Sequence, residues 1–144
     1  MTHGDKHRKL GRKTHHREAM LRNMSASLIK DERIITSVEK AKECQSFVEK
    51  LITKSEEYSL HKYRQVLSDL QDEDAVKKLF DKVGPMFEDR PGGYTRIVRL
   101  GGMRWIEGGK YASHQLGDDA ERCLFELVEK TDEFEEPEAE GDSE

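Results

Sequence analysis

Charge is segregated along this chain, and the segregation limits how much of it can fold. Residues 131–144 hold eight carboxylates and no Lys or Arg, whereas residues 1–30 hold eight Lys and Arg against two carboxylates. Blocks of like charge repel themselves and bury no apolar surface, so they do not build a packed core. We therefore predict a basic arm at 1–13, a folded domain at 14–130 and a disordered acidic tail at 131–144.

Length and composition exclude several classes of protein. At 144 residues, the chain has room for one domain, and no apolar run reaches the roughly 18–20 residues of a membrane span. Two cysteines, Cys44 and Cys123, are too few for a disulfide framework and indicate a reducing compartment. The basic start is not followed by an apolar stretch, as it would be in a secretory signal. We expect a cytoplasmic protein, and the lack of a transit-like leader favours a bacterial one.

The hydrophobic pattern predicts an α+β domain. Apolar residues spaced by three and four predict helices, and alternating residues predict strands. Helices are expected to begin near Thr14, Thr36, Tyr58 and Asp72, with strands at 31–36, 94–100 and 121–129. Residues 101–119 are expected to form a long loop, a hairpin connection. The order α-β-α-α-α-β-β favours two layers, with helices packed on a small sheet.

Several local signals refine this prediction. Thr36 with Glu39 matches a capping box for the second helix, and Gly84 followed by Pro85 is expected to end the fourth helix. Cys44 falls on the apolar stripe of the second helix, so we interpret it as a small buried hydrophobic residue. On the last strand, Cys123, Phe125 and Leu127 are expected to face the core.

Two segments have the composition of a polyanion-binding surface. Apart from Met1, the basic arm has Leu10 as its only large apolar residue, and each cation placed at a phosphate releases condensed counterions. Residues 89–96 add glycines for close backbone approach and Tyr94, which could stack on a base. Residues 90–110 carry five Lys or Arg against one Glu. A solvated arm and a plain turn are the alternatives, but together the segments favour RNA binding.

Catalytic and metal-binding signals are weak. His3, His7, His15 and His16 match no zinc spacing, and no Cys lies among them, so we expect no metal site there. Neither a nucleophile elbow nor a phosphate-binding glycine loop is present, so we expect no enzyme, no cofactor and no small-molecule substrate. Two alternatives stay open. One is a DNA- or RNA-binding regulator, and the other is a metal-dependent nuclease using His15, His16 and Asp72–Asp74.

Several ordered motifs resemble a known family. The segments KHRKLGR at 6–12 and HREAMLRNM at 16–24 resemble the start of the bacterial large-subunit ribosomal protein seventeen family. Later motifs follow in the family's order, and the resemblance covers roughly residues 6–130. These motifs are ERI at 32–34, AKE at 41–43, KLF at 78–80, GP at 84–85, GGYTR at 92–96 and ELV at 126–128.

The resemblance implies the same α-β-α-α-α-β-β order and a structural, non-catalytic role in the large ribosomal subunit. It also implies binding to large-subunit (23S-type) ribosomal RNA near the outer end of the peptide exit tunnel, beside neighbouring ribosomal proteins. Together with the charge pattern, it predicts an RNA-binding set of Lys6, His7, Arg8, Lys9, Arg12, Lys13, His15, His16, Arg17, Arg22, Asn23, Arg90, Gly92, Gly93, Tyr94, Thr95, Arg96 and Arg99.

The sequence departs from the family pattern at three places. Residues 1–5 precede the usual start, and the loop at 103–119 is longer than the family implies. The acidic tail is an addition whose carboxylates would repel RNA phosphates, so we expect it to shield the free basic protein or to point into solvent.

Overall fold

A computed structural model describes residues 3–4, 7–100, 104–106, 110–112 and 120–132. The RNA-binding prediction at Lys6 lies outside this part of the chain, as do residues 133–144 of the predicted tail. The elements, in chain order, are α1 (Thr14–Asp31), β1 (Arg33–Ser37), α2 (Val38–Ser55), α3 (Leu60–Leu70), α4 (Glu73–Lys78), a π-helical turn η1 (Leu79–Val83), α5 (Gly84–Met86), β2 (Thr95–Arg99), β3 (Arg104–Ile106), β4 (Lys110–Ala112) and β5 (Arg122–Leu127).

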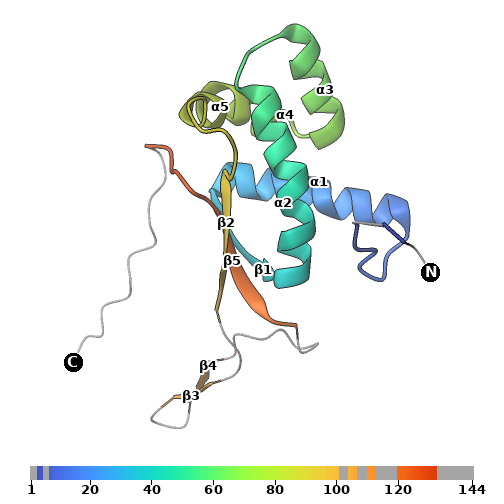
Figure 1. The fold of residues 1–144 in the computed structure, drawn as a ribbon, viewed down its shortest axis with the longest axis vertical. Helices are drawn as coiled ribbons and strands as arrows, with labels where there is room; N and C mark the ends of the chain where they lie inside the picture. The colour runs from blue at the N-terminus through green and yellow to red at the C-terminus, as the bar shows by residue number, and fades with distance from the viewer. Residues whose placement is uncertain (1–2, 5–6, 101–103, 107–109, 113–119, 133–144) are drawn as a thin grey trace.

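The main sheet is a three-stranded antiparallel sheet in the order β1-β5-β2. The last strand in sequence is therefore the central one, and α1 and α2 lie on one side of the sheet (Figure 1). Residues 101–119 connect β2 to β5, which pair antiparallel as the expected hairpin connection implies. The separate β3–β4 pair within this segment was not expected. The predicted α+β class and the helices-on-sheet arrangement are confirmed, and the predicted strand ends agree with the structure to within two residues.

The core lies between the helices and one face of the sheet. Cys123, Phe125 and Leu127 of β5 are fully buried there, as predicted, together with residues of α1, α2 and η1. Cys44 is fully buried as well, and burial raises the pKa of its thiol to about 11. Its role as a small core residue is therefore confirmed.

Two of the local predictions are wrong. The residue that caps α2 is Ser37, not Thr36, and its side chain makes no capping hydrogen bond. Gly84 and Pro85 do not end the helical segment, which continues to Met86. Gly84 has an ordinary helical φ of −56°, and a Cβ atom built there would lie 2.4 Å from the carbonyl oxygen of Ser55. Gly84 is thus placed by close packing against the end of α2, not by helix termination.

Asp72 caps α4 as the acidic run predicted. Its Oδ1 accepts the Ala75 backbone N–H at 3.1 Å, and its Oδ2 accepts Lys30 Nζ at 2.7 Å. At the C-terminal end of α1, Glu32 adopts a left-handed φ of 62° and donates its N–H to the Leu28 carbonyl. This cap turns the chain directly from α1 into β1 and fixes how the helix crosses the sheet.

Candidate nucleic-acid interface

The arm is a compact turn in front of α1. Leu10 and Gly11 both have positive φ, 55° and 64°, and the Arg12 N–H donates to the Lys9 carbonyl at 3.1 Å. The Arg12 guanidinium donates back to the Leu10 carbonyl at 2.9 Å. A positive φ is unfavourable for Leu10 but not for Gly11. The turn therefore carries this conformational cost at one of the two positions only.

Glu43 of α2 holds the start of the arm. It is 6% exposed, and its Oε1 lies 3.0 Å from His7 Nδ1. Its Oε2 accepts the Arg8 backbone N–H at 3.1 Å and lies 3.9 Å from the Arg8 guanidinium. A nearly buried carboxylate needs such donors, because leaving it unpaired costs several kcal/mol. Residues 7 and 8 are thus attached to the folded domain.

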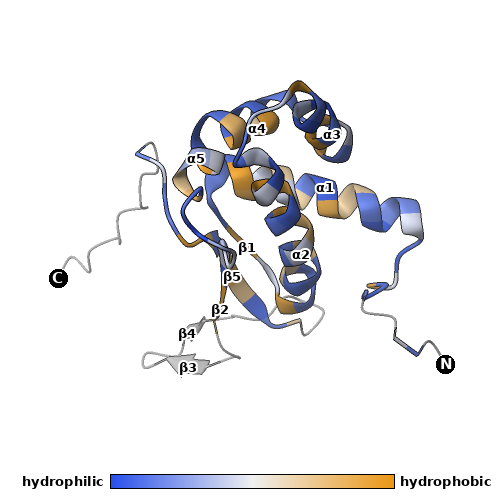
Figure 2. Cartoon of the chain, turned by 45° about the horizontal axis from the view of Figure 1, so that its top comes forward, coloured by the Kyte–Doolittle hydropathy of each residue, from blue (hydrophilic) through white to orange (hydrophobic). Residues whose placement is uncertain are grey.

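Beyond this anchor the cations are unneutralised. Within the described residues, the side chains of Lys9, Lys13 and Arg17 make no hydrogen bond or ion pair, and Lys9 and Lys13 are exposed. The exposed rings of His15 and His16 lie beside them on the first turn of α1. Figure 2 shows that the first turns of α1 are hydrophilic and that hydrophobic residues appear farther along the helix.

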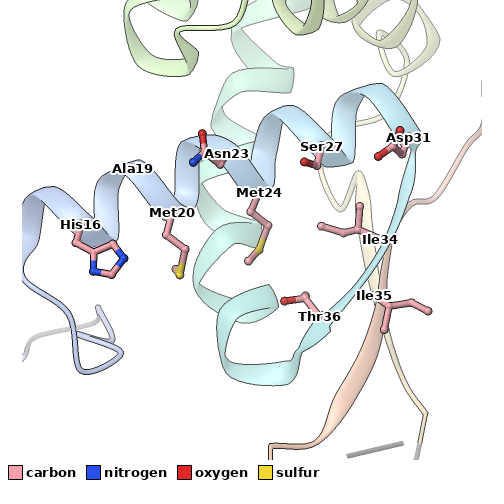
Figure 3. Close-up of a pocket in the computed structure, with 10 residues that line it drawn as sticks. All are labelled: His16, Ala19, Met20, Asn23, Met24, Ser27, Asp31, Ile34, Ile35 and Thr36. Atoms are coloured by element: carbon pink, nitrogen blue, oxygen red, sulfur yellow. The ribbon is translucent and has the colours of Figure 1, made fainter. Parts of the chain in front are cut away.

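The helix divides the next two predicted residues between different surroundings. Asn23 is exposed and lines an open groove with His16, Met20 and Met24 (Figure 3). Arg22 instead points toward α3, where its Nε donates to the Asp69 carbonyl at 2.8 Å. This geometry separates the two residues that were predicted to act together.

The second predicted segment is only partly open. Gly92 and Gly93 have φ values of 145° and 64°, and a Cβ atom at either would meet nothing within 4 Å. The backbone of this turn is therefore accessible. Its conformation is braced from inside by Arg90, whose Nε donates to the Gly92 carbonyl at 3.2 Å.

Tyr94 lies in the core and not on the surface. It is 3% exposed, its ring centroid is 5.2 Å from that of Phe87, and its hydroxyl donates to Glu56 Oε1 at 2.5 Å. The Glu56 carboxylate holds the hydroxyl proton and raises the pKa of Tyr94. Since both ring faces are enclosed in this structure, stacking of Tyr94 on a base would require it to leave the core.

Thr95 is also turned inward and is 6% exposed. Its hydroxyl donates to Glu49 Oε1 at 3.0 Å and accepts from Gln45 Nε2 at 3.1 Å, so both of its hydrogen-bonding roles are used on α2. The Tyr94–Thr95 pair thus fastens the start of β2 to α2. Its described contacts are structural.

The three predicted arginines of this segment each pair with a carboxylate from β5 or its flanks. Arg90 lies 3.9 Å from Glu129, Arg99 lies 3.1 Å from Glu121, and Arg96 binds Glu126. The positive charge of these three arginines is therefore offset by carboxylates from a distant part of the sequence. The first and second of these pairs are largely exposed, so each contributes little to stability.

Glu126 forms a different kind of cluster. It is 1% exposed, its Oε2 accepts Arg33 Nε at 3.0 Å and Lys130 Nζ at 3.2 Å, and its Oε1 accepts Arg96 Nε at 2.9 Å. Burial alone would raise the pKa of Glu126, but these hydrogen bonds lower it to about 2. Reasoning by sequence segment missed Arg33 and Lys130, because only the strand register brings them to one carboxylate.

The described residues give no support to metal chemistry. They contain no group of three His, Cys, Asp or Glu side chains placed to hold a metal ion. Asp72, a residue of the nuclease alternative, is occupied by Lys30 and the Ala75 N–H. Among the helices that the structure describes, none combines the length and apolarity needed to cross a membrane.

Comparison with known proteins identifies the family of this chain. The profile of the Ribosomal protein L17 family matches residues 20–128. The chain is 48% identical over 129 residues to the "Large ribosomal subunit protein bL17" of Amoebophilus asiaticus, covering 90% of this chain and 60% of that protein. The proteins of the same name from Phocaeicola vulgatus and Bacteroides thetaiotaomicron match at the same identity, with 72% of each covered.

The family match runs from the second turn of α1 to the end of β5, so it includes the three-stranded sheet and the helices from α2 to α5. They favour the ribosomal interpretation over the regulator and nuclease alternatives. The chain belongs to the Ribosomal protein L17 family, whose members are structural, non-enzymatic proteins of the bacterial large ribosomal subunit.

Proposed function

We propose that this protein is held on large-subunit ribosomal RNA chiefly by its arm and the first turns of α1. The observation that carries the proposal is the absence of partners for Lys9, Lys13 and Arg17 within the described residues, next to exposed His15 and His16. Cations that lack an internal carboxylate are available to phosphates, and their counterions are released on binding. The arm then supplies affinity without a catalytic group.

The Glu43 anchor supports this assignment. With residues 7 and 8 attached to α2, the following cations are presented from a defined place on the domain. Partial ordering before binding reduces the entropy that RNA binding must otherwise supply. We place Lys6, Arg8, Arg12 and Asn23 in the same interface.

The second segment has a smaller part in the proposal. The accessible backbone of Gly92 and Gly93 can approach phosphates. Phosphates can also replace, or bind beside, the carboxylates that now pair with Arg90, Arg96 and Arg99. We assign Tyr94 and Thr95 to holding this turn on α2. Arg22 donates its Nε to the Asp69 carbonyl and so supports the contact between α1 and α3, and the solvent-accessible part of its side chain can still face RNA.

The position in the subunit is part of the same proposal. The family resemblance supports a place near the outer end of the peptide exit tunnel, with 23S-type RNA and neighbouring large-subunit proteins as partners. The acidic tail would stay clear of the RNA, since its carboxylates repel phosphate.

Sedimentation tests the proposal. The tagged full-length protein is expected to comigrate with the large subunit in a magnesium-containing sucrose gradient. The K13Q/R17Q variant should be released at a lower salt concentration, because two phosphate-binding cations are removed. The K62Q/R64Q variant, which removes the same charge from α3, serves as the matched control. Wild-type protein remaining at the top of the gradient would contradict the proposal.

A further inference from the structure

The sheet has a second face that the helices do not cover. Successive residues of a strand point to opposite faces, and the core takes Cys123, Phe125 and Leu127 of β5. The register places the alternate residues in rows across the three strands, one of them Ile35–Leu124–Val98. Ile35 is 62% exposed and Val98 is 40% exposed. We call this surface the open face; it comprises Arg33, Ile35, Arg96, Val98, Arg122 and Leu124, with Glu126 beneath them.

Positive charge collects on the open face. Arg33, Arg96 and Arg122 lie on it, and Lys130 reaches the same cluster through Glu126. Glu126 is the one carboxylate among these residues, so the face carries a net charge of +3. The Arg99–Glu121 pair belongs to the alternate set of residues and is neutral. The net charge of the residues on the open face therefore differs from the net charge counted along a continuous stretch of the sequence.

Glu126 fixes two of these cations in place. Arg33 and Arg96 flank it on the two edge strands, and each directs Nε onto it, at 3.0 and 2.9 Å. The side chain of Arg96 is still 55% exposed and that of Arg33 28% exposed. Arg96 also donates an outer nitrogen, Nη2, to Glu126 Oε1, so two of its nitrogens are fixed while the exposed remainder of its guanidinium can bind a phosphate.

Arg122 adds an independent observation. Among the described residues, its Nε is a buried side-chain nitrogen without a hydrogen-bond partner. Buried donors are nearly always satisfied, and each exception calls for an explanation. Because this nitrogen is covered, an external acceptor reaches it only when the Arg122 side chain shifts toward the surface as the open face is occupied.

The open face is continuous with the interface of the arm and α1. The groove in Figure 3 runs from His16 and Asn23 on α1, past Met20 and Met24, to Ile34 and Ile35 on β1. Ile35 belongs to both the groove and the open face. A strand of nucleic acid that leaves α1 along the groove therefore arrives at Ile35, which lies two residues from Arg33 on the same face of β1.

We propose that the open face is a second binding surface for the phosphodiester backbone of ribosomal RNA, with Arg33, Arg96 and Arg122 as the phosphate contacts. The aliphatic row of Ile35, Leu124 and Val98 would lie against sugars or base edges. This inference rests on the proposed function and extends it to Arg33 and Arg122, which the sequence did not single out. An extended segment of a neighbouring protein is the competing occupant of the face.

A salt titration tests the phosphate contacts. The R33Q/R122Q variant of the full chain is compared with wild type for binding to transcribed bacterial large-subunit rRNA at several salt concentrations. The slope of log K against log salt should become shallower by about 0.7–0.9 for each phosphate that is no longer neutralised. The K62Q/R64Q variant on α3 removes the same charge and should keep the wild-type slope. Equal slopes for the two variants would overturn the proposal.

The K13Q/R17Q variant separates the open face from the arm. If K13Q/R17Q weakens RNA binding and R33Q/R122Q does not, the proposal for the open face is wrong and the proposal for the arm is supported. If R33Q/R122Q alone weakens RNA binding, the proposal for the open face is supported and the proposal for the arm is wrong. Thermal unfolding of each variant shows whether weakened binding comes from misfolding. Where it does, a crosslink from Val98 shows whether RNA occupies the open face.

The crosslink identifies the occupant without removing any cation. Val98 is replaced by photoreactive benzoylphenylalanine, and assembled large subunits are irradiated. A crosslink from this position to RNA is expected, whereas the same probe at the exposed Gln65 of α3 should give a different pattern. A crosslink from Val98 to protein alone, or none to RNA, would overturn the proposal.

Discussion

Arg33 and Arg96 lie on the two edge strands of the sheet and donate to opposite oxygens of one buried carboxylate, Glu126. The carboxylate thus joins the first and second strands in sequence through the last one. It also accepts Lys130, which donates to the Glu32 and Leu127 carbonyls as well. The cluster therefore fastens the C-terminal strand to both of its neighbours.

The E126Q variant should lose much of this stabilisation. Removing the charge leaves three cations around a neutral amide, and breaking a buried ion pair costs about 3–5 kcal/mol. Urea unfolding monitored by circular dichroism would measure the change. E121Q is the matched control, because Glu121 makes an exposed pair with Arg99 and should cost about 0–1 kcal/mol. Equal losses of stability for the two variants would contradict a special role for the cluster.

Acid should unfold the protein through the same carboxylates. The pKa of Glu126 is about 2 in the folded protein against 4.5 unperturbed, and hydrogen bonds from Lys78 and Thr131 also lower the pKa of Glu32, against its burial. A depressed pKa stabilises the fold above the unfolded value, and this contribution is lost as the pH falls from about 4.5 toward 2. Urea midpoints measured from pH 7 to pH 2 should fall in this window. The difference between wild type and E126Q should shrink there; a constant difference would contradict this assignment.

Gly84→Ala should destabilise the protein, although alanine is the better helix former. Propensity favours alanine by about 1 kcal/mol, but its Cβ would lie 2.4 Å from the Ser55 carbonyl oxygen, which is part of the backbone and cannot rotate away. Overpacking of this kind costs about 1–3 kcal/mol. Thermal unfolding measures the sign. Gly93→Ala is a useful comparison, since its space is open and only the left-handed φ of 64° is unfavourable.

Gly84 also shows where sequence reasoning reached its limit. Periodicity located the helices, the strands and the inward face of β5, because those depend on local spacing. A Gly-Pro pair looks like a helix end, yet the reason for Gly84 lies in Ser55, 29 residues away. Tyr94 was interpreted as an exposed ring for the same reason, since Phe87 and Glu56 meet it only in the fold. Arg33 was overlooked because its partner, Glu126, is 93 residues away.

Glu43→Gln should loosen the start of the arm without unfolding the domain. The variant loses the carboxylate that lies beside His7 and the Arg8 guanidinium, while its amide oxygen can still accept one N–H. The Arg8 amide should exchange its hydrogen faster, with the helix amides unchanged, as followed by NMR. Glu39→Gln, an exposed residue on the same helix, should leave the Arg8 amide unchanged. Unaltered exchange in E43Q would show that other contacts hold the arm.

Thr131 should belong to the folded domain and not to the acidic tail. Its N–H donates to Glu32 Oε2 at 2.8 Å, and its hydroxyl donates to Oε1 of the same carboxylate. Glu32 is 1% exposed and accepts Lys78 at 2.8 Å, so removing Thr131 would leave a buried charge with fewer donors. A chain ending at Lys130 should therefore be less stable than one ending at Asp132, by about 1–3 kcal/mol.

The two truncated chains both lack the carboxylates beyond Asp132 and differ by Thr131 and Asp132, and of these two residues Thr131 makes the hydrogen bonds to Glu32. Thr131→Val in the full chain removes the hydroxyl alone and should give an intermediate loss of stability. Urea unfolding of all three chains provides the measurement. Equal stability of the two truncated chains would place the domain boundary at 130, where the charge pattern first put it. A loss of stability confined to the shorter chain would place it after Thr131, because a buried carboxylate and not the onset of acidic residues decides where the fold ends.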